Sequence, residues 1–317
     1  MNPRPGGPGT SPPRDAFVHP ALFYRDDEEY LAGTVPFIRA GRESGEPVAV
    51  AVPGERLGTL REALGRTAGE VSWLDMSEAG RNPGRIIPGV LRDFADRHAA
   101  AGRVRIIGEP IWPGRSATEY PACAQHEALI NLAFEGRGVS ILCPYDVSGL
   151  DDVAIADARA THPVVIDRHG EHVSGDYAPD RVISAYNRPL PEPAGAVEMS
   201  FDLDALPLVR EFVTRWAARF GLGPRAVGDL ELAANELAAN SCLHGGGAGT
   251  ARLWSEDGQV VCEVRDAGTI TDPLAGRRPA DMSPDGGRGI LMVNHLADLV
   301  RMHTGPDGTA VRVYMRH

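Results

Sequence analysis

The chain has 317 residues, 43% of them hydrophobic, and a formal net charge of -11. It is therefore long enough for two folded domains, and its acidity argues against direct binding to nucleic acid or to an anionic membrane. All 32 basic residues are arginine, which excludes a lysine-dependent phosphate loop and catalysis by a lysine amine.

The chain shows no sign of a membrane or secretory segment. No apolar run approaches the roughly 20 residues of a membrane span. The opening MNPRPGGPGTSPPR lacks the apolar core of a signal peptide, and its Pro and Gly predict a disordered tail over residues 1–15. The four cysteines form no C-x-x-C pair, so we expect reduced thiols in a cytoplasmic protein.

Residues 16–187 alternate short apolar runs with amphipathic stretches. Two of these stretches, residues 88–100 and 117–134, have helical periodicity. Strands alternating with helices predict an α/β domain with a mostly parallel sheet between helical layers. The predicted strands are VAVAV (Val48–Val52), VSWLDM (Val71–Met76), VRIIG (Val104–Gly108) and VSILCPYD (Val139–Asp146).

The segment RPLPEPAGA, residues 188–196, is the predicted linker, because its prolines cannot continue a helix or a central strand. Residues 197–317 then predict an α+β two-layer sandwich with an antiparallel sheet. The expected elements are a strand in AVEMSFDL, helices over 206–220 and 224–243, a hairpin turning near Asp257-Gly258, a polar loop over 271–287, a helix over 289–297 and a strand pair closed at Asp307-Gly308.

The second of these helices contains ELAANELAAN, a pentapeptide printed twice. Each copy places a Glu four residues before an Asn, so each pair lies on one face of the helix. Glu231 and Asn235 lie on one flank of the inward face, and Glu236 and Asn240 lie on the other. Helical rotation alone does not choose between the two pairs.

The residues downstream favour the second pair. Asn240 is followed by His244-Gly245, and the boxes VRDAG, GGRGILMV and GTAVRVYM come later in the chain. In this order and spacing they resemble the GHKL ATP-binding fold, in particular the anti-sigma-factor serine kinases of bacteria. The resemblance covers residues 197–317 and implies that the domain binds ATP and Mg²⁺.

The resemblance also implies a role for each residue. Glu236 would be the catalytic base, and Asn240 would hold Mg²⁺ through its amide oxygen. Asp266 and Gly268 would receive adenine, with Thr309 in support. The remaining ATP-site residues are His244 and the phosphate-binding segment Gly287, Arg288 and Gly289.

One residue departs from the family pattern. Ile270 stands where D-x-G-x-G would have its second glycine, so the sequence leaves open whether the chain transfers phosphate or only binds ATP. A third alternative is a sensor histidine kinase, because His126 lies in H-E-x-L-I-N. No long helical hairpin accompanies that motif, which argues against this alternative. His169 and His172 lie in a charged segment without a ligand set to complete a metal site, so we expect a solvated loop.

The first domain resembles the MEDS sensory module of bacterial regulators. The resemblance rests on His19–Pro53, GEPIW, the helix bearing Glu127 and LCPYD, and it implies a RecA-like fold that senses a small molecule or a protein. The expected sensory residues are His19, Tyr24, Glu109, Glu127 and Tyr145, because polar residues at strand ends line α/β crevices.

Together the two resemblances predict a sensory anti-sigma regulator that phosphorylates Ser or Thr of a STAS-type anti-sigma antagonist. A sigma factor is a second expected partner. The sequence leaves the oligomeric state open, with a homodimer among the alternatives.

Overall fold

The computed structural model describes residues 16–279 and 288–317. The predicted tail over residues 1–15 and the end of the polar loop therefore lie outside the described residues. In the described part the chain forms two sheets, one of seven strands and one of five. No helix among the described residues combines the length and apolar composition that crossing a membrane requires.

The first sheet has the strand order β3-β2-β4-β5-β1-β6-β7 and is parallel except for β7, which pairs antiparallel with β6. The predicted α/β class with a mostly parallel sheet is thus confirmed. Its strands are β1 (Pro20–Tyr24), β2 (Val48–Val52), β3 (Ser72–Asp75), β4 (Val104–Gly108), β5 (Val139–Asp146), β6 (Val164–Asp167) and β7 (Gly170–Val173).

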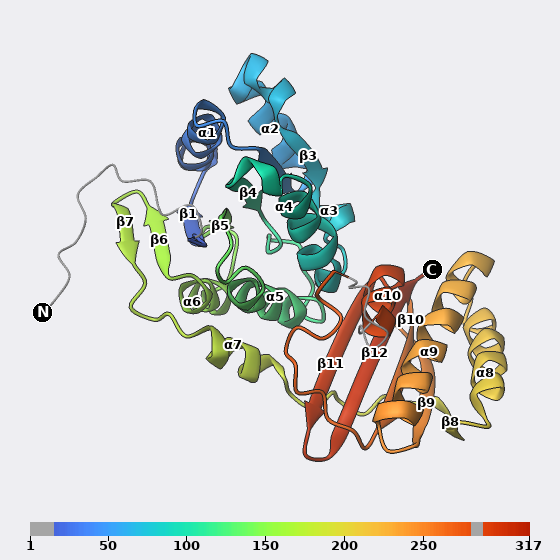
Figure 1. Ribbon diagram of the computed structural model, residues 1–317. Coiled ribbons are helices and arrows are strands. Elements are labelled where there is room, and N and C mark those ends of the chain that lie inside the picture. The colour runs from blue at the N-terminus through green and yellow to red at the C-terminus, as the bar shows by residue number, and fades with distance from the viewer. Residues whose placement is uncertain (1–15, 280–287) are drawn as a thin grey trace, which may run out of the picture.

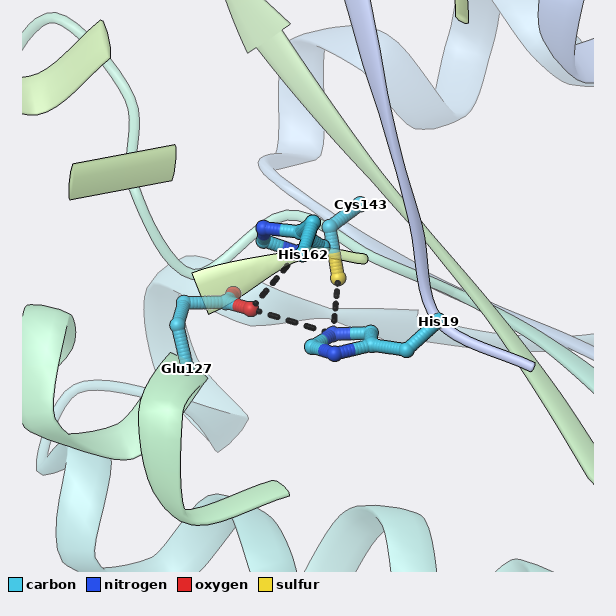
Figure 2. A group of neighbouring side chains, drawn as sticks. All are labelled: His19, Glu127, Cys143 and His162. Atoms are coloured by element: carbon cyan, nitrogen blue, oxygen red, sulfur yellow. Dashed lines mark hydrogen bonds and ion pairs between the residues drawn. The ribbon is translucent and has the colours of Figure 1, made fainter. Parts of the chain in front are cut away.

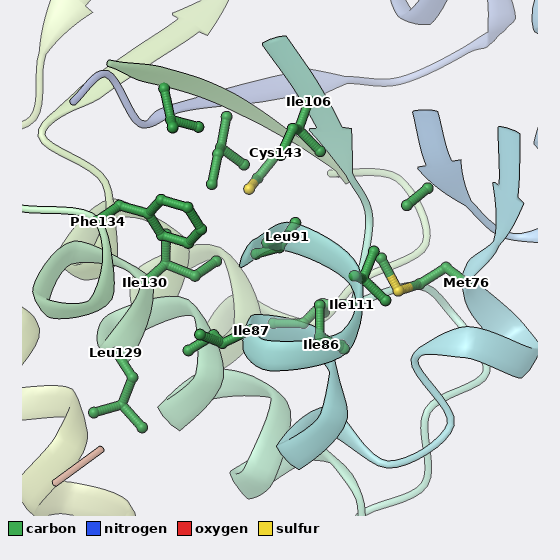
Figure 3. Close-up of a cluster of buried hydrophobic side chains, with 14 of the residues drawn as sticks. Met76, Ile86, Ile87, Leu91, Ile106, Ile111, Leu129, Ile130, Phe134 and Cys143 are labelled. Atoms are coloured by element: carbon green, nitrogen blue, oxygen red, sulfur yellow. The ribbon is translucent and has the colours of Figure 1, made fainter. Parts of the chain in front are cut away.

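Helices cover both faces of this sheet (Figure 1). α1 (Asp27–Glu43) and α2 (Gly54–Leu64) pack on one face through Tyr30, Ile38 and Leu60. The opposite face is covered by a larger apolar cluster (Figure 3), to which Leu91, Ile130 and Phe134 contribute. The remaining helices are α3 (Met76–Ala79), α4 (Asp93–Arg97), α5 (Tyr120–Ala133), α6 (Asp152–Thr161), α7 (Pro179–Tyr186), the 3-10 turns η1 (Gly65–Glu70), η2 (Pro83–Arg85) and η4 (Ala99–Ala101), and the π-helix η3 (Ile87–Arg92).

The helix expected over residues 88–100 is divided. Residues 87–92 are a π-helix, and α4 continues it over 93–97. Pro88 lies in the first turn, where its missing N–H is tolerated, and the next residue is Gly89, which has a low α-helix propensity. The apolar face still packs against the sheet through Val90, Leu91 and Phe94.

The second sheet is antiparallel throughout, with the order β11-β12-β10-β9-β8. Three helices pack on one face of it (Figure 1) and form a separate core, so the expected second domain with an antiparallel sheet is confirmed. Its elements are β8 (Val197–Asp202), α8 (Leu206–Arg219), α9 (Pro224–His244), β9 (Ala248–Glu256), β10 (Gln259–Asp266), α10 (Arg288–Leu296), β11 (Leu299–Gly305) and β12 (Gly308–Arg316). At the predicted hairpin turn, Asp257 and Gly258 have φ of 47° and 72°, as a type I′ turn requires.

The other face of the second sheet meets the first domain and the linker. Ala122 of α5 packs in one cluster with Trp254, Val261 and Tyr314 of this face. Glu192 of the linker forms ion pairs of 2.7 Å with both Arg252 and Arg265. The sheet is therefore covered on both sides.

Candidate functional site

A pocket of about 610 Å³ lies between α9, the end of β10, the start of α10 and β12. Its lining brings together seven of the residues expected at the ATP site: Asn240, His244, Asp266, Gly268, Arg288, Gly289 and Thr309. Of the other two expected residues, Glu236 is not among the lining residues, and Gly287 lies outside the described residues. Segments more than 60 residues apart in the sequence thus line one pocket.

The two copies of the pentapeptide lie in different surroundings. Glu231 accepts hydrogen bonds from Arg210 Nε at 2.8 Å and Thr214 Oγ1 at 3.2 Å, so it faces α8. Glu236 and Asn240 instead face the first turn of α10. A Cβ built on Gly289 would lie 3.1 Å from Glu236 Oε2 and 3.0 Å from Asn240 Nδ2. Of the two pairs, only the second faces the start of α10, and its Asn240 lines the pocket.

This end of the pocket suits a divalent cation and phosphates. Carboxylate and amide oxygens are the hard donors that Mg²⁺ prefers. The start of a helix also presents unpaired backbone N–H groups to an anion. Any side chain at position 289 would enter the space between these donors. Asn240 could therefore hold Mg²⁺ beside the N-terminus of α10, whose N–H groups could receive phosphate oxygens.

Asp266 also lines the pocket and is fixed by hydrogen bonds. Its Oδ2 accepts a hydrogen bond of 2.6 Å from Ser241 Oγ, and its Oδ1 accepts one of 2.8 Å from the Gly268 N–H. A Cβ on Gly245 would lie 2.4 Å from Asp266 Cγ, and a Cβ on Gly268 would lie 2.7 Å from Gly245 Cα. The two glycines therefore permit the close approach that holds the carboxylate as an oriented acceptor.

A chain of hydrogen bonds fixes the segment after Asp266. Thr309 Oγ1 donates to the Gly268 carbonyl at 2.8 Å, and it lies 2.9 Å from Thr304 Oγ1. Thr304 Oγ1 in turn accepts from the Ile270 N–H at 2.9 Å. Ile270, the departure from the family pattern, thus has a defined backbone position, and its side chain lines the pocket.

The five expected sensory residues do not lie in one crevice. Tyr24 and Glu109 follow the carboxyl ends of β1 and β4, and Tyr24 Oη donates to Glu109 Oε1 at 3.0 Å. Burial raises the pKa of the Glu109 carboxyl to about 8. His19 lies before the amino end of β1, where its Nε2 is 3.3 Å from Glu127 Oε2. Tyr145 is buried on β5, with its ring centroid 5.5 Å from that of His162.

Two residues that sequence reasoning missed complete the group around His19 and Glu127. Cys143 Sγ lies 3.4 Å from His19 Nε2, and His162 Nε2 lies 3.2 Å from Glu127 Oε2. Cys143 lies in the apolar strand β5, and His162 lies two residues before β6. A polar side chain in or next to an apolar strand is the local signal that could have identified them. Their proximity depends on β5 and β6 both pairing with β1.

The other histidines named from the sequence do not extend either site. His126 is 1% exposed, and burial lowers its pKa to about 3, so its imidazole does not present itself to a nucleotide. His172 lies on β7, a strand exposed along its whole length, and His169 directly precedes it.

Comparison with known proteins identifies both halves of the chain. Residues 18–163 match the family model described as MEDS, the methanogen/methylotroph, DcmR sensory domain. Residues 199–315 match the model of the histidine kinase-like ATPase domain. No curated protein matches the chain.

Among solved structures, the chain is similar to the RsbU and RsbW domains of Rv1364c from Mycobacterium tuberculosis. The identity is 20% and the TM-score 0.30 over 39% of this chain, and the match spans 32% of that structure's chain. The predicted fusion is confirmed by the two family matches: this chain is a MEDS domain followed by a histidine kinase-like ATPase domain.

Proposed function

We propose that the chain is a sensory anti-sigma regulatory factor that binds Mg-ATP and phosphorylates a serine or threonine of a STAS-type anti-sigma antagonist, thereby controlling a sigma factor. One observation carries the proposal. Asn240 and Asp266 line one pocket, and Glu236 faces the first turn of α10 next to Asn240. A nucleotide can therefore extend from an adenine acceptor to a carboxylate beside its phosphates.

The chemistry assigned to each residue follows from its place. Asp266 would accept a hydrogen bond from the adenine amino group, and Asn240 would hold the cation. Bound Mg²⁺ would screen the phosphate charge. Glu236 would accept the proton of the attacking hydroxyl as its oxygen bonds to the γ-phosphorus, while the bond to the bridging oxygen breaks and ADP leaves. Arg288 and His244 line the same pocket and would contact the phosphates.

We further assign a RecA-type fold to residues 16–187, a linker role to residues 188–196 and a GHKL-type fold to residues 197–317. The parallel strand order of the first sheet and the helix-covered antiparallel second sheet support these assignments. The segment between α7 and β8 contains neither a helix nor a strand, and it includes the proline-rich residues 188–196.

A direct contact would carry the signal between the domains. Asn82, which caps the N-terminus of η2, is fully buried, and its Nδ2 donates to the Asn294 carbonyl on α10 at 2.8 Å. Beside it, Arg81 Nη1 lies 2.8 Å from Asp298 Oδ1. Because the first turn of α10 faces Glu236 and Asn240, a shift of η2 would reach the phosphate end of the pocket.

The test is phosphotransfer from γ-labelled ATP to purified STAS-domain antagonists, with nucleotide binding measured in parallel. We expect acid-stable phosphate on the antagonist from wild type and from Glu231→Gln, and at least a hundredfold loss of rate in Glu236→Gln. Binding of ATP without any transfer would instead indicate an ATP-gated binding module. Acid-labile phosphate on the chain itself, lost in His126→Ala, would indicate a histidine kinase.

A further inference from the structure

Four side chains capable of binding a metal converge in the core of the MEDS domain (Figure 2). His19, Glu127, Cys143 and His162 each direct one donor atom inward, and all four donor atoms lie within 4.8 Å of one another. None of the four residues is more than 2% exposed. They come from four segments: the residue before β1, the middle of α5, β5, and the turn between α6 and β6.

The outer nitrogens of both imidazoles are already paired. His162 Nδ1 lies 2.8 Å from the Ala158 carbonyl, to which it can only donate. His19 Nδ1 lies 3.2 Å from Asn131 Oδ1, while Asn131 Nδ2 donates to the Thr161 carbonyl at 2.9 Å. A proton on each Nδ1 leaves each Nε2 with a lone pair directed at the centre of the group. Such contacts from the second ring nitrogen typically orient histidines that bind metals.

The centre of the group thus collects negative charge and lone pairs. Glu127 Oε2 lies 3.3 Å from His19 Nε2 and 3.2 Å from His162 Nε2. Glu127 Oε1, Glu127 Oε2 and His162 Nε2 are buried side-chain atoms without a hydrogen-bond partner in the described part of the chain.

We propose that His19, Glu127, Cys143 and His162 together bind one Zn²⁺ ion. Two neutral imidazoles, a carboxylate and a thiolate form a four-donor set, the number that a closed structural zinc site uses. The carboxylate and thiolate balance the charge of the ion, so no net charge is buried. On binding, the thiol proton of Cys143 is released to solvent.

The donor separations fit this ion. Tetrahedral zinc with bonds of about 2.0–2.3 Å places its donors roughly 3.3–3.6 Å apart. The nearest donor contacts here are 3.2, 3.3 and 3.4 Å. Zinc would thereby tie β1, β5 and β6 to α5, the helix that also packs Ala122 against the second sheet.

A different use of the same atoms is a Cys-His-Asn nucleophile, because Cys143, His19 and Asn131 follow one another at hydrogen-bonding distances. A nucleophile must meet its substrate, however, and Cys143 is 1% exposed. Glu127 also competes with the thiol for His19 Nε2. The burial therefore favours an ion over a substrate.

The test is the zinc content of the purified full chain after dialysis against a weak chelator, measured by mass spectrometry of the metal. We expect about one zinc per chain in wild type and at least tenfold less retained zinc in Cys143→Ala. Cys123→Ala is the matched control, because Cys123 is fully buried in the same apolar cluster and should keep its zinc. Where Cys143→Ala fails to fold, Glu127→Gln replaces it.

Cobalt gives a second readout that reports the donors themselves. Co²⁺ added to the metal-free chain should show the visible bands of a tetrahedral ion and a thiolate charge-transfer band, and Cys143→Ala should lose the latter. A folded wild type that retains no zinc and gives no such spectrum overturns the proposal. So does rapid alkylation of Cys143 in the native, undialysed chain, which would identify an accessible nucleophile.

Discussion

Ser241 Oγ donates a hydrogen bond of 2.6 Å to Asp266 Oδ2 and so joins α9, which carries Glu236 and Asn240, to the end of β10. The helix that would hold the cation and the strand that would bind adenine are thereby fixed to each other. The contact also restrains the carboxylate in one rotamer, with its other oxygen held by the Gly268 N–H.

Replacing Ser241 with alanine should weaken nucleotide binding without removing any group that touches the phosphates. A hydrogen bond to a charged group contributes about 1.5 kcal/mol, so we expect roughly a tenfold rise in the Kd for ATP. Asp266→Asn should have a larger effect, because it replaces one carboxylate oxygen, which accepts hydrogen bonds, with an NH₂ group, which donates them. Isothermal titration measures both, and an unchanged Kd in both variants would contradict the adenine assignment.

Substitutions of the two asparagines in the doubled pentapeptide should have different effects on ATP binding. Asn240→Ala removes an amide oxygen at the first turn of α10 and should abolish the Mg²⁺ dependence of ATP binding. Asn235→Ala, the same substitution on the same helix, should leave it intact, since its partner Glu231 faces α8. The measurement is a Kd titration with and without Mg²⁺, and equal losses in the two variants would count against the assignment.

Gly228 on α9 and Gly245, which caps the C-terminus of that helix, offer a matched pair. A Cβ at Gly245 would meet Asp266 Cγ at 2.4 Å, whereas nothing lies within 4 Å of a Cβ at Gly228. Gly245→Ala should therefore cost about 1–3 kcal/mol of unfolding free energy and weaken ATP binding. Gly228→Ala should stabilise the helix by up to about 1 kcal/mol. Urea unfolding of both variants, followed by ATP titration, tests the pair.

The contact between the domains can be tested away from the pocket. A Cβ at Gly84 would lie 2.0 Å from Asn294 Oδ1, so Gly84→Ala must displace the Asn294 side chain or α10 itself. We expect it to raise the Kd for ATP several-fold. Gly89→Ala is the control, because a Cβ there meets nothing within 4 Å. Identical affinities in the two variants would argue that η2 does not influence the ATP site.

Glu109 predicts a pH dependence of stability. Its pKa rises from 4.5 to about 8 because the carboxyl is buried, so over this range the folded chain holds a proton that the unfolded chain has released. The contribution of Glu109 to unfolding free energy is therefore fully present below pH 4.5, falls as the pH rises, and levels off above pH 8.

Glu109→Gln cannot ionise and should remove this dependence of the unfolding free energy on pH. The unfolding free energy of the variant relative to wild type should therefore be higher at pH 8 than at pH 5. The measurement is urea unfolding across that interval, with the exposed Glu62→Gln as control. If the unfolding free energy depends on pH equally in wild type and in Glu109→Gln, Glu109 is not the source of that dependence.

Local patterns in the sequence predict the strands and the helix termini well. β5 covers the whole of the predicted VSILCPYD strand, and α9 begins at the predicted Pro224. The hairpin turn at Asp257-Gly258 is likewise where its residue types predict. In contrast, the predicted elements did not include β1, α1, α2, α6, α7 or the β6–β7 hairpin. The last four elements span ten residues or fewer each, which offers few positions for a periodic pattern.

The residues that line the candidate ATP pocket could be named from the sequence because they fall in short motifs, each held by one turn or one helix end. The sequence by itself determined these boxes, the absence of a lysine-dependent phosphate loop and the division into two domains. Only the tertiary structure decided that Glu231 faces α8, and that Cys143 meets His19 across 124 residues. The physical reason is that such contacts depend on which parallel strands become neighbours, and strand order is set by the packing of the whole sheet rather than by any local run of residues.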